Sequence, residues 1–208
     1  MNFVIEPMHF EYLAVQHGRI SDLRHDFKAW KEAYEASIEG DYESLKPILP
    51  SRAVKCLDVG GGLSGISARL QKHYDEEHAT FTACVLDGKA DAPVVIEHSI
   101  PFNNATVTQN FLRLNGVQSQ RFIAPNEPLP PRLDLVISIQ AWGFHFTPEM
   151  YAERVAACLT SEALVVMDLR KEKPAWFDLC MEYFGPQALV LATAPKWTRW
   201  AFSRYKIE

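Results

Sequence analysis

The sequence predicts an α/β fold, a three-layer sandwich in which helices cover a seven-stranded, mainly parallel sheet. From residue 53 onward, short apolar runs alternate with amphipathic segments, which is typical of repeated strand and helix units. The last two apolar runs, ALVLATA and TRWAFSRYKI, are separated only by PKW. That link is too short for the crossover between parallel neighbours, so these runs must form an antiparallel hairpin. A helical segment precedes the first strand.

This N-terminal segment is expected to be helical over residues 8–47, because Phe27, Trp30 and Tyr34 recur at spacings of three and four. We assign residues 1–50 as a helical lead-in. Its aromatic residues could make it a lid over a ligand site or the interface of a homodimer.

The repeated units are expected to contain five strands and three helices before the hairpin. Strands are predicted at 54–59, 80–86, 120–124, 133–139 and 163–168, and helices at 65–77, 104–114 and 148–159. Thr147 is a candidate N-cap of the last helix, with Pro148 at its first position, and Asn115-Gly116 ends the middle one. A fourth helix, AWFDLCMEYF, follows Pro174.

Composition limits the function classes. With 208 residues, 48% of them hydrophobic, the chain suits one domain with a full core. A net charge of -5 disfavours a nucleic-acid partner, which needs clustered lysine and arginine. No run approaches the roughly 20 apolar residues of a membrane span, and Glu6 and Glu11 fall where a signal peptide needs cations and an apolar core. We therefore expect a cytoplasmic protein with neither a nucleic-acid nor a membrane partner.

The cysteines do not indicate a metal site. Each is isolated in an apolar run, with no CxxC pair and no histidine at ligand spacing. They are Cys56, Cys84, Cys158 and Cys180. We expect reduced core residues and no bound metal.

The strongest local motif is LDVGGGLSG at residues 57–65, in which Gly60, Gly62 and Gly65 satisfy the GxGxxG pattern. Glycines at this turn let a ligand approach the backbone amides and the start of the following helix. The alternative is a tight strand-to-helix connection without a ligand. Four glycines in six residues are more than a bare connection requires, which favours a ligand site.

Asp87 ends the second predicted strand, 22 residues after Gly65. In an open α/β sheet, a carboxylate there can accept hydrogen bonds from both ribose hydroxyls of a bound nucleotide. An ordinary solvated loop aspartate is the alternative. A nicotinamide reductase is disfavoured, because the only YxxxK spacing, Tyr42 to Lys46, lies upstream of the glycine loop.

The segment VKCLDVGGGLSG, with Asp58 two positions before the first glycine, resembles the first motif of the class I S-adenosylmethionine-dependent methyltransferases. The lead-in, LDLVISIQ, ALVVMDLR and the terminal hairpin are similar to that family's seven-stranded plan, and the resemblance covers residues 54–207. It implies a Rossmann-like, cofactor-binding domain over residues 51–208 that takes S-adenosylmethionine. The sequence departs from the family at Ser64, where a third glycine is frequent.

The resemblance, together with the rule that ligands bind outside the carboxyl ends of the strands, gives a set of expected cofactor contacts. They are Asp58, Gly60, Gly61, Gly62, Asp87, Gly88, Asn126, Glu127, Ser138 and Gln140. A carboxylate after strand three commonly contacts adenine in the family, and here Asn126 or Glu127 must serve.

The fourth strand leads into QAWGFHFTPEMY, where aromatic side chains surround His145. Aromatic faces can hold a sulfonium cation or stack on a sugar ring, and histidine can accept a proton from a hydroxyl near neutral pH. We assign His145 as the base, with Asp168 or Glu127 as an orienting or alternative carboxylate. Expected substrate contacts are Trp142, Phe144, Tyr151 and Arg170. The alternative is that Trp142 and the phenylalanines are core residues and His145 is simply hydrogen-bonded.

The expected function is therefore methyl transfer from S-adenosylmethionine to a hydroxyl of a small molecule, sugar or glycan. Enzymes that methylate amino groups resemble one another in an (N/D)PP(Y/F) tetrad after strand four. This sequence has SIQA there, at 138–141, which argues against DNA methylation. Asp168 alone would be a poor magnesium site. Two alternatives stay open: a non-catalytic, methyltransferase-like partner protein that binds the cofactor, and a nicotinamide-dependent oxidoreductase.

Overall fold

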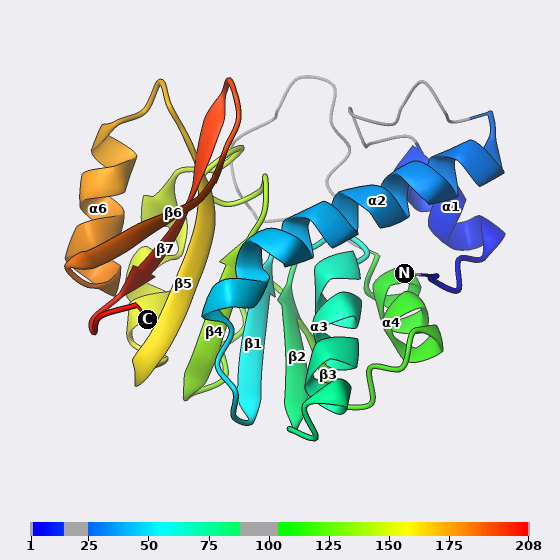
Figure 1. The fold of residues 1–208 in the computed structure, drawn as a ribbon, viewed down its shortest axis with the longest axis horizontal. Coiled ribbons are helices and arrows are strands. Elements are labelled where there is room, and N and C mark those ends of the chain that lie inside the picture. The colour runs from blue at the N-terminus through cyan, green and yellow to red at the C-terminus, as the bar shows by residue number, and fades with distance from the viewer. Residues whose placement is uncertain (1, 15–24, 88–103, 208) are drawn as a thin grey trace.

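The computed structural model describes residues 2–14, 25–87 and 104–207. Its centre is one seven-stranded sheet in the order β3-β2-β1-β4-β5-β7-β6 (Figure 1). The strands are β1 (Val54–Val59), β2 (Phe81–Leu86), β3 (Gln120–Ile123), β4 (Leu133–Ser138), β5 (Leu159–Arg170), β6 (Gln187–Thr193) and β7 (Trp197–Ser203). Neighbours among β1 to β5 are parallel, whereas β7 is antiparallel to both β5 and β6. The predicted mixed sheet and terminal hairpin are confirmed.

Helices cover both faces of the sheet, so the three-layer prediction is also confirmed (Figure 1). The first face carries α1 (Pro7–Ala14), α2 (Phe27–Leu45), α3 (Gly65–Glu76) and α4 (Ala105–Leu114), and the second carries α5 (Ala152–Ala156) and α6 (Ala175–Phe184). Strands buried on both faces read as the continuous apolar runs seen in the sequence.

The N-terminal lead-in packs into the same core as the sheet. Asp26 caps α2 by accepting a 3.0 Å hydrogen bond from Ala29 N, and Trp30 and Tyr34 of α2 stack at 5.3 Å within the first core cluster. The helix runs diagonally across the sheet (Figure 1). Its last turn tightens into a short 3-10 helix at Lys46–Ile48, which contains Pro47.

One predicted helix was too long. Residues 148–159 contain only a 3-10 turn (Pro148–Met150) and the five-residue α5, and β5 begins at Leu159, four residues before its predicted start. The reason is tertiary: Leu133 N donates to Cys158 O at 2.8 Å and Leu133 pairs with Leu159, which draws these residues into the sheet. Thr147 makes no side-chain cap.

Within the described ranges, none of the helices combines the length and apolar character that a bilayer span needs. The same ranges hold no cluster of three or more histidine, cysteine or acidic residues placed to bind a metal ion. Cys56, Cys84 and Cys180 are buried, and Cys158 is half-buried.

Candidate functional site

The glycine loop lies where the strand order reverses, between β1 and β4, which is where open α/β sheets bind ligands. Gly60 and Gly62 adopt left-handed backbone conformations, with φ of 72° and 59°. A Cβ atom on Gly60 would lie 2.5 Å from Cβ of Ala141, in the segment after β4. The bare backbone is therefore required by two causes, its conformation and the close approach of the neighbouring segment.

Asp87, at the end of β2, is joined directly to this loop. Its half-buried carboxylate accepts a 2.9 Å hydrogen bond from Gly62 N through Oδ2. On the other side of the same peptide segment, Thr108 Oγ1 of α4 donates to Gly62 O at 2.7 Å. The carboxyl end of β2 and the glycine loop after β1 thus form one hydrogen-bonded unit. Gly88, also expected to contact the cofactor, lies outside the described residues.

Asp58 supports the loop from inside the protein. It is buried and accepts hydrogen bonds from the hydroxyls of Ser64 and, at 3.1 Å, Ser67. Burial raises the pKa of Asp58 to about 6, although the two hydroxyls act in the opposite direction. A Cβ on Gly61 would meet Asp58 Oδ2 at 2.5 Å, so the carboxylate fills the space under the loop.

Ser64 has a structural role at the position where the methyltransferase family frequently has a glycine. It is the N-cap residue of α3 with a left-handed backbone at φ 62°, and its hydroxyl is part of the Asp58 network. Sequence reasoning treated Ser64 only as a missing glycine and did not include Ser67. The spacing of both serines from Asp58, at six and nine residues, was the available signal.

The lead-in helix also reaches the loop. The Tyr34 hydroxyl of α2 lies against the Gly65 backbone, so a Cβ added to Gly65 would lie 2.3 Å from the Tyr34 oxygen and 3.0 Å from Ile38. Burial raises the pKa of Tyr34 well above its usual range. Gly65 is thus needed for close packing of α2 on α3. Helical periodicity predicted a helix at Tyr34 but not which element its side chain would contact.

Two residues expected at the ligand instead build the β4 end of the scaffold. Ser138 is buried; its Oγ donates to Val59 O at 3.0 Å and accepts from Trp142 N at 2.8 Å. Trp142 is 1% exposed, and its Nε1 donates to Pro148 O at 3.0 Å. Trp142 is therefore a core residue, as the alternative interpretation of the sequence expected. Gln140 is half-buried with a left-handed backbone at φ 53°.

His145 lies on a tight turn after β4 whose amides bond back to Ala141 O, that of His145 at 2.7 Å. The residue is exposed overall, yet enough protein surrounds the ring to lower the pKa of His145, and the charge of Arg170 lowers it further. The rings of Phe144 and His145 meet edge to face at 4.9 Å, and the Arg170 guanidinium lies 4.8 Å from the Phe144 ring centre. The structure thus groups three of the predicted residues.

Tyr151 lies on the border of the second core, with its ring 5.9 Å from Trp142. The pKa of the Tyr151 hydroxyl is raised, mainly by burial. The charge of Arg154 lowers this pKa, and the charge of Asp87 raises it.

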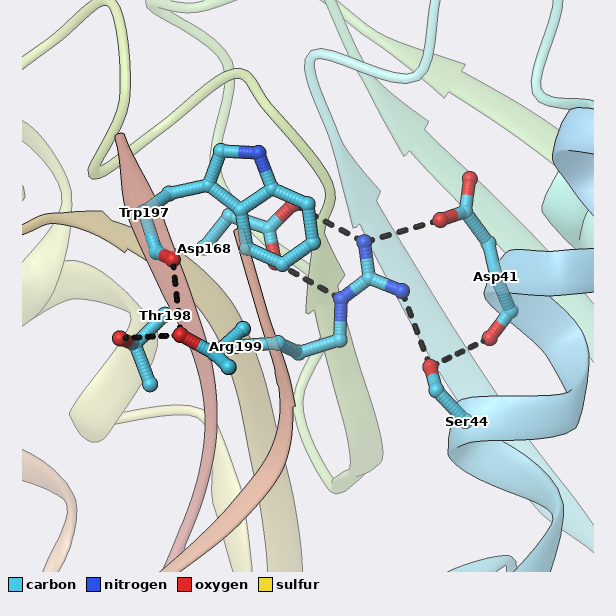
Figure 2. A network of polar contacts seen from close by, with 7 residues as sticks. Asp41, Ser44, Asp168, Trp197, Thr198 and Arg199 are labelled. Atoms are coloured by element: carbon cyan, nitrogen blue, oxygen red, sulfur yellow. Dashed lines mark hydrogen bonds and ion pairs between the residues drawn. The ribbon is translucent and has the colours of Figure 1, made fainter. Parts of the chain in front are cut away.

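Asp168 is committed to a different partner. It is fully buried, and Arg199 of β7 donates to both its oxygens, from Nε at 2.7 Å and Nη2 at 2.9 Å (Figure 2). The same guanidinium bonds Asp41 and Ser44 of α2, each at 2.9 Å. Asp168 therefore ties the sheet to the lead-in helix through Arg199, and this arrangement gives no support to the expected orienting or base role.

Asn126 and Glu127 are exposed on the turn after β3. Arg154 of α5 holds this turn by donating to the carbonyls of Pro125 and Glu127, both at 2.6 Å. The Glu127 carboxylate accepts from Ala124 N at 3.4 Å and so caps its own turn. The turn is fixed in place, with the Asn126 side chain at its surface.

Comparison with known proteins supports the fold. No family model matches the chain, and no curated protein sequence matches it. Among solved structures, a candidate O-methyltransferase from Nostoc punctiforme has TM-score 0.56 and 14% identity over 81% of this chain and 58% of its own. A TehB-like SAM-dependent methyltransferase from Corynebacterium glutamicum has TM-score 0.54 and 14% identity over 96% of this chain and all of its own.

A third similar structure is a T. thermophilus 16S rRNA methyltransferase in complex with AdoMet and guanosine, with TM-score 0.50 and 13% identity over 79% of this chain and 38% of its own. The chain thus spans 58% of the Nostoc protein and the full length of the Corynebacterium one. At these identities the comparisons establish architecture. The protein has the Rossmann-like fold of the class I SAM-dependent methyltransferases.

Proposed function

We propose that this protein binds S-adenosylmethionine and transfers its methyl group to a hydroxyl of a small molecule, sugar or glycan. The observation that carries the proposal is the hydrogen bond between Asp87 and the backbone of Gly62. It puts a carboxylate suited to ribose hydroxyls against a glycine loop with no side chains, at the point where the strand order reverses.

The residues present fit the cofactor. Asp87 offers an acceptor for the two ribose hydroxyls, and hydrogen bonds to a charged group are the stronger ones. The glycine loop allows the nucleoside to approach main-chain atoms, and the N-terminus of α3 follows at Gly65. The Asp58, Ser64 and Ser67 network holds the loop in this shape. When bound, the cofactor supplies a methyl group on a positively charged sulfur.

His145 is the proposed base. The acceptor hydroxyl oxygen forms the new bond to the methyl carbon, the electron pair of the broken bond stays on sulfur, and the hydroxyl proton passes to an imidazole nitrogen of His145. Burial and the charge of Arg170 lower the pKa of His145, which favours the neutral imidazole that can accept that proton. Positioning of the hydroxyl in line with the methyl group supplies the remaining rate enhancement.

Calorimetric titration with S-adenosylmethionine, S-adenosylhomocysteine and NAD tests the cofactor assignment. The first two should bind and NAD should not. Asp87→Ala should weaken binding by roughly 10- to 100-fold, the range expected for hydrogen bonds to a charged group. Asp178→Ala is the matched control, because Asp178 is exposed on α6 on the opposite face of the sheet.

The outcomes separate the functions that the sequence left open. Binding of NAD alone would favour the oxidoreductase and overturn the proposal. Tight cofactor binding without turnover of any hydroxyl acceptor would favour the non-catalytic partner protein. Equal weakening by both aspartate variants would remove the specific role of Asp87.

A further inference from the structure

Arg170 at the end of β5 is held beside the proposed base. Its backbone N donates to Gly143 O at 3.3 Å, which joins the end of β5 to the turn that carries His145. Its guanidinium lies 4.8 Å from the Phe144 ring centre, and the Phe144 and His145 rings are 4.9 Å apart. The influence of Arg170 on the pKa of His145 agrees with this closeness.

The guanidinium of Arg170 has donor capacity left over. Nη1 donates to Glu172 Oε1 at 2.9 Å, and among the described residues the buried Nε has no hydrogen-bond partner. The side chain is 35% exposed, and its guanidinium carbon lies over the Phe144 ring, 4.8 Å from the ring centre. A guanidinium held over an aromatic ring presents a planar fork of donors that matches carboxylate and phosphate oxygens.

The surroundings of Arg170 have an excess of positive charge. Lys171 and Lys173 stand one and three residues after Arg170 and are exposed. Lys171 N donates to Lys196 O at 3.1 Å, which brings the exposed Lys196 to the same edge. Glu172 is the acidic residue within the stretch 170–173. An anion arriving at this edge meets a net positive field.

We propose that the methyl acceptor carries an anionic group, a carboxylate or phosphate, which Arg170 binds while the acceptor hydroxyl faces His145. This inference rests on the proposed function and narrows its substrate class. In the absence of acceptor, Glu172 occupies part of the fork. Since its side chain is 55% exposed, an acceptor anion can displace it at little cost.

Matched acceptor pairs test the substrate class: hydroxy acids against their methyl esters, and sugar phosphates against the parent sugars. The wild-type protein should prefer the anionic member of each pair. Arg170→Gln should raise KM for the anionic member by roughly 10- to 100-fold, without changing KM for the neutral one or the affinity for S-adenosylmethionine. Glu172→Gln should lower KM for the anionic member. Arg121→Gln, on the exposed edge strand β3, is the control.

A second measurement does not depend on turnover. The pKa of His145 can be read from an NMR titration, with its signal assigned by comparison with a His145→Gln variant. In the wild type, adding acetate or inorganic phosphate should raise this pKa. In Arg170→Gln the same anions should raise it far less. The comparison of the two anions shows which anionic group the site prefers.

Each outcome decides one proposal. If S-adenosylmethionine does not bind, the proposed function fails. If it binds and neutral acceptors are preferred, or Arg170→Gln affects both members of a pair equally, only the anionic acceptor is excluded. If no acceptor in the panel turns over, the NMR titration decides: an anion effect that is identical in wild type and Arg170→Gln overturns the role of Arg170.

Discussion

Asp168 and Arg199 face each other directly across the β5 and β7 pairing and form a two-pronged buried ion pair, with N to O distances of 2.7 and 2.9 Å. The arginine is 1% exposed and the aspartate is not exposed at all. Because Arg199 also contacts Asp41 and Ser44, this pair joins the sheet to α2 (Figure 2).

Replacing Arg199 by methionine should be strongly destabilising, because it leaves the Asp168 charge buried without a partner. We expect a loss of about 3 to 5 kcal/mol in the free energy of unfolding, measured by urea denaturation. Adding Asp168→Asn should recover part of that loss. The control is Arg52→Met, whose pair with Asp134 is more exposed and should cost at most about 1 kcal/mol. Equal losses in the two single variants would show that burial of the Arg199 pair is unimportant.

Two glycine substitutions should have opposite effects on stability. Gly60→Ala places a Cβ 2.5 Å from Ala141 at a φ of 72°, so it should cost about 1 to 3 kcal/mol and weaken cofactor binding. Gly40→Ala, inside α2 with no atom within 4 Å of the new Cβ, should stabilise by about 0.5 to 1 kcal/mol. Thermal unfolding measures both. A harmless Gly60→Ala would contradict the close packing of the loop.

Gly65 and Tyr34 should be energetically coupled. Gly65→Ala should destabilise, because the new Cβ would lie 2.3 Å from the Tyr34 hydroxyl. Tyr34→Phe removes that oxygen and with it the clash. The loss of unfolding free energy in the double variant should therefore be smaller than the sum of the two single losses, by about 0.5 to 3 kcal/mol. A double-mutant cycle in urea measures the coupling; strictly additive losses would mean that α2 and the loop are independent.

The buried carboxyl of Asp58 should make stability fall as the pH rises from about 4 to 6. Its pKa of about 6 in the folded protein lies above the model-peptide value of about 3.9, so the folded state holds the proton more tightly. The contribution of Asp58 to the free energy of unfolding is at its maximum below about pH 4. It falls by about 3 kcal/mol as the pH rises to about 6. The measurement is the difference in unfolding free energy between wild type and Asp58→Asn across this range. A difference that is flat or rises with pH would show that the pKa is not raised.

Loss of His145 should affect turnover and not cofactor binding. His145→Asn should lower kcat by about 100- to 10,000-fold, the usual contribution of a general base, with S-adenosylmethionine affinity unchanged. His78→Asn, exposed after α3, should leave both unchanged. Because the pKa of His145 is lowered, the acidic limb of the wild-type rate profile should lie below pH 6.5. Parallel loss of binding and turnover would indicate a structural role for His145.

Local sequence patterns correctly predicted the bounds of elements that depend mainly on neighbouring residues. The bounds of β1 were exact, because an apolar run ended by glycines leaves little freedom, and Pro174 and Gly185 delimited α6. Gly62 and Asp87 could be related because their spacing belongs to one strand, helix and strand unit. The predicted extension of the helix to residue 159 was wrong because pairing with β4 overrode helical periodicity.

Distant pairings could not be predicted in this way. The partner of Asp168 is fixed by the antiparallel register of β5 and β7, which no local pattern gives. The burial of Trp142 depends on contacts with α6 through Phe184, 42 residues away in sequence. Charge or aromatic character alone does not show whether a side chain faces a ligand or the core.

Arg199 bonds Ser44 across 155 residues of sequence, and this separation has a consequence for biosynthesis. When α2 leaves the ribosome, the arginine that anchors it has not yet been translated, and the partner of Asp168 is also absent until β7 is made. The nascent chain therefore cannot reach its native state until β7 has been synthesised, and premature termination before β7 would release a polypeptide with unneutralised acidic groups and an exposed apolar sheet, a target for chaperones and proteases.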